Sequence, residues 1–131
     1  MGERPYSSLP ARCSIETSDC LYDEGAPVPI KYAVIDHAGS GDNTLVAAVA
    51  GKKIRVLSYV FVVTGAVNVR FESGAGGTAL TGVMNFDAAG KGISASYSPK
   101  GHFQTAAAAL LNLELSGAVS VDGHLTYIEA T

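Results

Sequence analysis

The chain has 131 residues and a mass of 13.4 kDa, the size of a single domain that can hold its own core. Hydrophobic residues make up 47% of it and charged residues 16%, which excludes an intrinsically disordered chain and leaves little charge for a monomer surface. The formal net charge is −3, and the lysines and arginines are scattered, so nucleic acid is not an expected partner. We expect copies of the chain or a partner to cover exposed apolar surface.

No stretch reaches the roughly 18 to 20 continuous apolar residues of a membrane helix, because charged residues interrupt the best one between Lys52 and Glu72. The N-terminus, MGERPYSSLPARC, has no apolar core of a secretory signal. We therefore expect a protein made in the cytoplasm, without membrane contact. Free thiols at Cys13 and Cys20 are then the default, and a disulfide is the alternative if the mature protein becomes extracellular.

Residues 1–30 are predicted to form an extended N-terminal arm. Prolines at positions 5, 10, 27 and 29 interrupt this segment, and no periodicity persists long enough for a helix. The acidic residues near Cys20 lack the ligand spacing of a calcium-binding loop, so we interpret them as a solvated turn.

Residues 31–131 are predicted to form a domain of about eight to ten short strands. Its first strand is KYAVIDHA, from Lys31, and its second is NTLVAAVA, after a turn at residues 39–42. A long hairpin follows over residues 52–74, with its turn at Thr64 and Gly65. Apolar residues occupy both faces of its first strand, residues 54–63, which favours a sandwich interior or an oligomer interface.

The remaining elements are predicted to be short strands joined by tight turns. SGAGGTALTG, residues 73–82, is predicted to be a flexible or tightly turned connection without the ordering of a phosphate-binding loop. VMNFDA, GISASYS and LNLELSG are predicted to be strands. Thr105–Ala109 is too short for a stable helix, so we expect a turn or a loose bulge there. Asp122 and Gly123 predict the turn of a final hairpin. Together these elements predict an all-β, antiparallel, jelly-roll-like β-sandwich, with a small closed barrel as the alternative.

Histidines are the natural candidates for acid–base chemistry or zinc binding. His37, His102 and His124 lie far apart in the sequence, and no pair has the spacing that places two ligands on one element. Asp36 and His37 are adjacent and point to opposite faces of a strand. We therefore expect no catalytic residue, no cofactor and no metal site.

Two segments carry a resemblance to a known class of proteins. The segments are GKKIRVLSYVFVVTGAVNVRFESGAGGTALTG and SYSPKGHFQTAAAALLNLELSGAVSVDGHLTYIEA, and from the start of the first to the end of the second they span about 80 residues. They contain the motifs at positions 53–57, 69–74, 80–82, 99–106 and 111–127. In these motifs the chain resembles small structural proteins of tailed bacteriophages. None of the motifs is catalytic, and the resemblance does not extend to the segment before Lys31.

The resemblance implies a non-enzymatic virion component, made in the host bacterial cytoplasm. Within that class it implies a capsid decoration or cement protein with a jelly-roll fold. Such a protein acts as a homotrimer on the outer shell, with the major capsid protein as its partner. The arm residues expected to contact the capsid or sister subunits are Tyr6, Leu9, Ile15, Leu21 and Tyr22.

Two alternatives stay open. The first is a tail, baseplate or fibre-tip module that recognises host glycans or proteins, for which Tyr97, near Ser96, Ser98 and His102, offers an aromatic beside polar groups. The second is a cupin-like metal enzyme. That reading lacks the HxH pair such a site requires.

Overall fold

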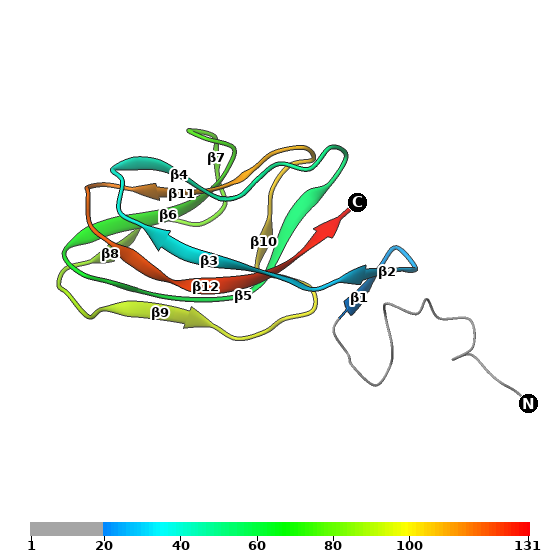
Figure 1. The fold of residues 1–131 in the computed structure, drawn as a ribbon, viewed down its shortest axis with the longest axis horizontal. Coiled ribbons are helices and arrows are strands. Elements are labelled where there is room, and N and C mark those ends of the chain that lie inside the picture. The colour runs from blue at the N-terminus through cyan, green and yellow to red at the C-terminus, as the bar shows by residue number, and fades with distance from the viewer. Residues whose placement is uncertain (1–19) are drawn as a thin grey trace, which may run out of the picture.

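The described residues fold as a β-sandwich, which confirms the predicted all-β antiparallel class. The structure is a computed structural model that describes residues 20–131. Its strands are β1 (Cys20–Asp23), β2 (Ala26–Pro29), β3 (Lys31–His37), β4 (Gly41–Val46), β5 (Lys53–Val63), β6 (Val67–Ser73), β7 (Thr78–Ala79), β8 (Met84–Phe86), β9 (Gly92–Ala95), β10 (Phe103–Gln104), β11 (Leu111–Leu115) and β12 (Val121–Ala130). Figure 1 shows the two layers, with the β1–β2 hairpin at one end beside the C-terminus.

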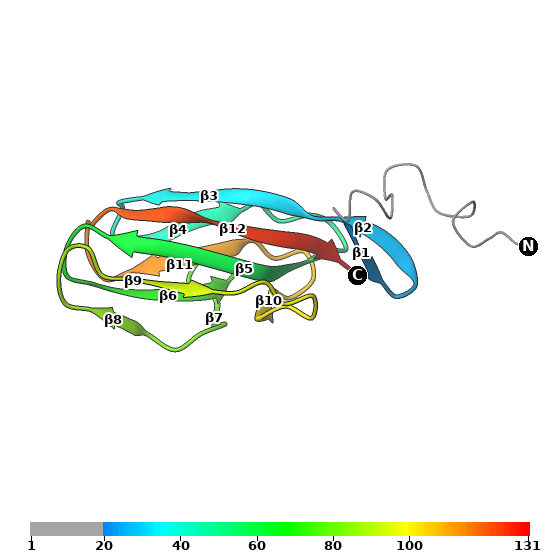
Figure 2. The ribbon, with the colours of Figure 1, turned by 90° about the horizontal axis from the view of Figure 1, so that it is seen from below.

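Each layer is a five-stranded antiparallel sheet. The β3 sheet has the order β10-β5-β12-β3, with β9 also paired to β5, and the β4 sheet has the order β4-β11-β6-β7, with β8 also paired to β6. Figure 2 looks onto the face of the β3 sheet, where β3, β12 and β5 lie side by side. From β3 onward the chain changes sheet six times: between β3 and β4, β4 and β5, β5 and β6, β8 and β9, β10 and β11, and β11 and β12. Most strands that follow one another in sequence therefore lie in different layers.

The core lies between the two sheets and is built from alternate residues of the long strands. β11 contributes Leu111, Leu113 and Leu115, all at most 1% exposed. An aromatic group fills the middle, with the Tyr59 and Phe71 ring centroids 5.1 Å apart and those of Phe71 and Phe103 4.9 Å apart. Such tilted aromatic contacts add to the burial of apolar area.

The predicted hairpin at Thr64 and Gly65 is wrong. β5 pairs with β12, β9 and β10, while β6 pairs with β11, β7 and β8, so the two strands belong to opposite sheets. A tight two-residue hairpin turn needs a residue with positive φ, and Gly65 is not among the positive-φ glycines. Thr64 instead donates from its backbone N and its Oγ1 to the carbonyl of Ser120, which ties this connection to the loop before β12.

The predicted turn at Asp122 and Gly123 is also wrong, because both residues lie inside β12. There Asp122 pairs with Asp36 and Val62, and Gly123 pairs with Ile35 and Phe61. A Cβ on Gly123 would lie 1.9 Å from the carbonyl oxygen of Val60. The glycine therefore allows the close approach of β12 to β5, which is a different role from forming a turn.

A β-bulge in β5 shifts the predicted alternation of its faces. Thr126 pairs with Ser58 while Tyr127 pairs with Val56, so Leu57 is an extra residue on β5. Val56 and Leu57 are both fully buried, one in the main core and the other in a second cluster. A strict period of two therefore describes only the residues on either side of the bulge.

The β1–β2 hairpin covers that second cluster. Leu57, Ile128 and Ala130 are buried there, and the hairpin side places Leu21, Val28 and Ile30 against them. Within the predicted arm, residues 20–29 thus form a paired hairpin, with Cys20 opposite Pro29. The arm prediction for residues 1–19, including Tyr6, Leu9 and Ile15, lies outside the described residues.

The redox expectation for Cys20 differs from the structure. Cys20, the first residue of β1, is disulfide-bonded, whereas free thiols were the default expectation. The other cysteine of the sequence, Cys13, lies outside the described residues.

The predicted turn at Thr105–Ala109 is confirmed. Thr105 is 2% exposed, and its Oγ1 accepts a hydrogen bond from the backbone N of Ile54. Ala108 has a φ of 59°, which a helix does not allow. This loop therefore forms no helix, and Thr105 holds it by hydrogen bonds to Ile54 near the start of β5.

Candidate functional site

The outer face of the β3 sheet carries an exposed apolar strip. Tyr32 and Val34 on β3 are 80% and 69% exposed, and Val62 on β5 is 47% exposed. Val34 pairs with His124, which pairs with Val60, so these three side chains form one row across the sheet. Exposed tyrosine and valine side chains on a flat sheet face are typical of a protein contact surface.

The two rows on either side of the Val34 row each combine an apolar residue, Tyr32 or Val62, with polar residues. In the next row, Tyr32 pairs with Thr126, whose Oγ1 lies 2.6 Å from the Oγ of Ser58. In the row on the other side, Asp36 pairs with Asp122. We name Tyr32, Val34, Val60, Val62 and His124 the apolar strip.

β3 is an edge strand of this sheet. It pairs with β12 on one side, and on its other side it pairs with no strand of the described residues. An unpaired strand edge beside apolar side chains invites association with another chain. The strip and the edge together make the β3 side of the molecule the best candidate for a docking surface.

The outer face of the β4 sheet is polar and carries a carboxylate cluster, which we define as Asp42, Glu72 and Glu114 with the adjoining Asn112 and Arg70. One carboxylate oxygen from each of the three acids lies within 4.8 Å of the others. Strand register explains the meeting, because Glu114 pairs with Asp42 on one side and with Arg70 on the other, while Asn112 pairs with Glu72.

Asn112 joins the cluster through its amide nitrogen. Nδ2 donates to Asp42 Oδ1 at 2.8 Å and to Glu72 Oε1 at 2.9 Å. Arg70 donates to the other oxygen of Glu72 through Nε at 2.9 Å and through a second guanidinium nitrogen. Asn112 is 0% exposed and Glu72 is 1% exposed, an unusual depth for polar residues on an outer face.

The buried amide is only half satisfied. Asn112 Oδ1 has no hydrogen-bond partner, and among the residues that the structure describes it is the one buried side-chain nitrogen or oxygen in that state. An unpaired buried acceptor costs about 1–3 kcal/mol, so it needs an explanation.

The glycine-rich connection after β6 closes over one side of the cluster. Gly76 donates its backbone N–H to Asp42 Oδ1 at 3.0 Å, and β7 pairs Ala79 with Glu72. A Cβ on Gly77 would lie 2.0 Å from the carbonyl oxygen of Ser73, so this turn tolerates no larger residue there. The segment is tightly turned, as predicted.

Electrostatic interactions set opposite pKa directions for the two paired acids. The hydrogen bond with Asp42 raises the pKa of Glu114 above its usual value, and desolvation and the charges of Asp42 and Glu72 raise it further. The pKa of Asp42 is lowered by hydrogen bonds from Glu114, from the Gly76 backbone and from Asn112. Glu114 is therefore the member of the pair that holds a shared proton.

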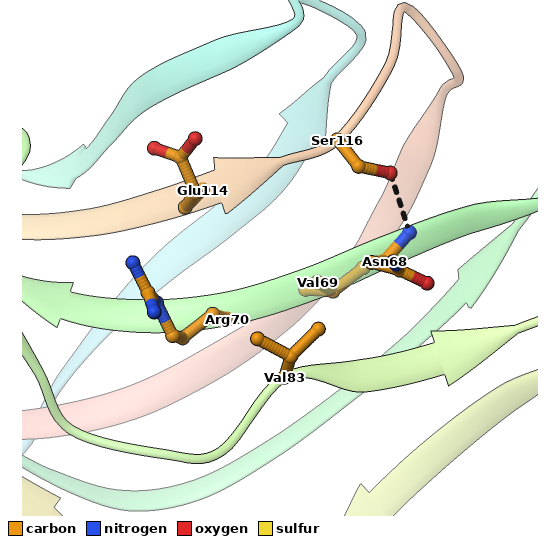
Figure 3. Close-up of a pocket in the computed structure, with 6 residues that line it drawn as sticks. All are labelled: Asn68, Val69, Arg70, Val83, Glu114 and Ser116. Carbon is orange, nitrogen blue, oxygen red and sulfur yellow. Dashed lines mark hydrogen bonds between the residues drawn. The ribbon is translucent and has the colours of Figure 1, made fainter.

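A shallow groove opens beside the cluster. Its volume is about 220 Å³, and its lining residues are Asn68, Val69, Arg70, Val83, Glu114 and Ser116. Figure 3 shows Glu114 and Arg70 on neighbouring strands of the groove, with Ser116 accepting a hydrogen bond from the backbone N of Asn68 at 2.8 Å. Through Glu114 and Arg70 the cluster thus reaches solvent.

The histidines considered in the sequence do not meet. Among the described residues, the carboxylate cluster is the one group of three or more acids, histidines or cysteines close enough to share a metal ion. His37 ends β3 and His124 lies in the apolar strip. His102 donates from Nε2 to the carbonyl oxygen of Ser96 at 2.7 Å.

The contact residues predicted in the arm are only partly described. Leu21 packs against Leu57 and its neighbours in its own chain, and Tyr22 is 56% exposed. Sequence reasoning missed the carboxylate cluster, because its acids come from strands about 30 to 40 residues apart, at positions 42, 72 and 114. Alternating polar residues in β6 and β11 indicate that each strand has a solvent-facing side. They do not indicate which residues of the two strands pair with each other.

The sequence matches no protein-family model, and the search of curated proteins finds no match. The part of the chain described by the structure has no helix that is long and apolar enough to cross a membrane.

Proposed function

We propose that the protein is a structural virion component that binds the outside of a bacteriophage capsid and stabilises the shell as a decoration, or cement, protein. The observation that carries this proposal is the difference between the two outer faces. The β3 sheet exposes the apolar strip, with Tyr32 at 80% and Val34 at 69%, whereas the β4 sheet exposes a charged, hydrogen-bonded surface. Such one-sidedness suits a protein that docks by one face and presents the other to solvent.

The strand order supports the same proposal. In the five-stranded sheets β12 lies between β3 and β5, while β11 lies between β4 and β6. The short strands β9 and β10 both pair with β5, and β7 and β8 both pair with β6. We propose that this double-sheet arrangement is a jelly roll, an architecture used by capsid and carbohydrate-binding domains. Architecture alone carries no function, so the apolar strip remains the main support.

A homotrimer in contact with the major capsid protein is the proposed active form. Binding of the trimer across several capsid subunits adds interface free energy that favours the closed shell over its dissociated parts. The apolar strip would supply buried contact area, and the exposed Tyr22, with the predicted arm residues, would extend that contact along a neighbour.

The test combines solution mass with shell binding. Light scattering of the purified chain measures its oligomeric state, and sedimentation with shells that lack the protein measures binding and copy number. A trimer that saturates shells at hundreds of copies is the expected result. A chain that does not bind shells would overturn the proposal and favour a tail location.

A tail or fibre-tip module that binds host glycans is the second candidate, and one feature of the structure favours it. Tyr97 is 52% exposed on a loop that the His102–Ser96 contact closes and that a 2.9 Å hydrogen bond from Ser98 N to the Leu57 carbonyl anchors to β5. An exposed aromatic on an anchored loop is suitable for stacking on a sugar ring. Glycan-array binding that Tyr97→Ala abolishes, in a chain that does not bind shells, would identify this function instead.

A further inference from the structure

We propose that the carboxylate cluster on the outer face of the β4 sheet is a binding site for a divalent cation of the calcium type. The cation would be held by Asp42, Glu72 and Glu114, with the side chain of Asn112 as a fourth ligand. This site is independent of the proposed capsid role.

The positions of the three acids fit such an ion. Their nearest oxygens lie within 4.8 Å of one another, and calcium binds oxygen at about 2.3–2.6 Å, so ligands on opposite sides of one ion lie up to about 5 Å apart. Asp42 and Glu114 are directly paired across β4 and β11, and Glu72 lies on the next strand. Three adjacent strands of a sheet therefore hold the ligands in fixed positions.

The charge of the cluster also favours a divalent ion. Three carboxylates and the single guanidinium of Arg70 leave a charge of −2 when all the groups are ionised. Arg70 bonds only to Oε2 of Glu72, which leaves Oε1 directed toward Asn112 and the other acids. A divalent cation would neutralise the remaining charge without displacing the arginine.

Asn112 gives the second, independent indication of a ligand. Its side chain is fully buried, its amide lies between Asp42 and Glu72, and its Oδ1 has no partner. Oxygen and nitrogen of an amide exchange places by a half-turn of the group. After that turn Oδ1 faces the carboxylates, where a cation would use an oxygen that otherwise has nothing to bond.

The groove and the glycine-rich turn complete the site. Glu114 lines the groove of about 220 Å³, which gives an ion and its waters a path from solvent. The Gly76 N–H donates to Asp42 and keeps this carboxylate in place. Oxygen ligands, partial exposure and retained water are typical of calcium sites outside the cytoplasm, where affinities are submillimolar to millimolar.

The test is calcium titration of the full chain by isothermal titration calorimetry after chelator treatment, together with melting temperatures in calcium and in EDTA. We expect one calcium per chain with a Kd at or below about 1 mM and a Tm that rises by a few degrees at saturation. No binding heat and no Tm shift at about 10 mM calcium would overturn the proposal.

Matched variants locate the site. Glu114→Gln should weaken binding at least about tenfold, because it replaces a charged ligand by a neutral one. The variant should still fold, because glutamine has nearly the shape of glutamate and position 114 is only partly buried. Asp87→Asn, which changes an exposed acid outside the cluster, should bind calcium like the unmodified chain. Equal affinity of Glu114→Gln and the unmodified chain would show that calcium binds elsewhere and would overturn the assignment.

Discussion

Single residues decide how closely strands of this sandwich approach one another, and Gly123 is the sharpest case. Its missing Cβ leaves space for the backbone of β5, since an added carbon would lie 1.9 Å from Val60 O. Gly123→Ala should lower the free energy of unfolding by about 1–3 kcal/mol, because β5 or β12 must move. Urea denaturation measures this loss.

Gly82→Ala is the control for that change. No atom lies within 4 Å of a Cβ at position 82, and Gly82 is not among the positive-φ glycines. The free energy of unfolding of the Gly82→Ala variant should stay within about 0.5 kcal/mol of that of the unmodified chain. Equal losses in the two variants would show that the close approach at Gly123 is not the cause.

Asp23 is a second residue with a measurable role, because it holds the end of β12. Its Oδ2 accepts hydrogen bonds from Thr131 N at 2.7 Å and from Thr131 Oγ1 at 2.9 Å. The backbone bond from Thr131 is the largest cause that lowers the pKa of Asp23, and its side-chain bond and the charge of Arg55 lower it too. The folded state therefore prefers the ionised carboxylate.

The sign of the pH dependence follows from that lowered pKa. The stabilisation is complete above the ordinary value of 3.8 and is lost as the pH falls through the lower folded value. Asp23→Asn should cost about 1–2 kcal/mol near neutral pH, and this difference should shrink below about pH 4. Urea denaturation across that range tests it, and a constant difference at every pH would contradict it.

At the level of elements, the bulge in β5 connects the main core to the β1–β2 hairpin. The extra residue, Leu57, directs its side chain to the outer face, where Leu21 and Val28 cover it. Leu57 and Ile128 are the two large buried side chains beneath the hairpin, so the loss of Leu57 would remove about half of that contact.

Leu57→Ala should therefore lower the unfolding free energy by about 2–4 kcal/mol and loosen the hairpin. Hydrogen exchange should show faster exchange for β1 and β2 amides than in the unmodified chain. Val62→Ala, on the same strand and 47% exposed, is the control and should change stability by less than about 1 kcal/mol. Unchanged exchange in β1 and β2 would show that Leu57 does not hold the hairpin.

Sequence patterns were a good guide to which residues form strands. They were a poorer guide to which strands pair with each other. The alternation in Leu111–Leu115 located β11 and its core-facing side, because leucine occupies every second position there. It did not predict that Asn112, on the other side, is buried as well. Thr64–Gly65 and Asp122–Gly123 were predicted as hairpins, since a local turn signal does not reveal a strand that changes sheet or a glycine required by a neighbouring strand. The carboxylate cluster depends on pairing between distant strands, which one sequence does not encode locally.

At the level of the whole molecule, the two outer faces predict one-sided association. Replacing Tyr32 by Ser and Val34 by Thr removes apolar contact area from the most exposed part of the strip without touching the core. We expect self-association or shell binding to weaken by about tenfold or more. Light scattering and shell sedimentation measure the change.

Val83→Thr is the matched control for that surface. Val83 is 58% exposed and lines the groove beside the β4 sheet, on the other layer of the sandwich. The Val83→Thr variant should associate as strongly as the unmodified chain. If it weakened association as much as the Tyr32 and Val34 changes, the docking surface would lie on the β4 side.

The central place of β12 in its sheet determines when this protein can fold during its synthesis. β12 pairs with β3 on one side and with β5 on the other, and Tyr127 lies opposite Lys31. The ribosome makes β3 and β5 well before it makes their shared neighbour. Until β12 is made, β3 has no partner among the described strands and β5 has partners only on its β9 and β10 side. The nascent chain is therefore most exposed to aggregation, and most in need of a chaperone, until residue 130 has emerged.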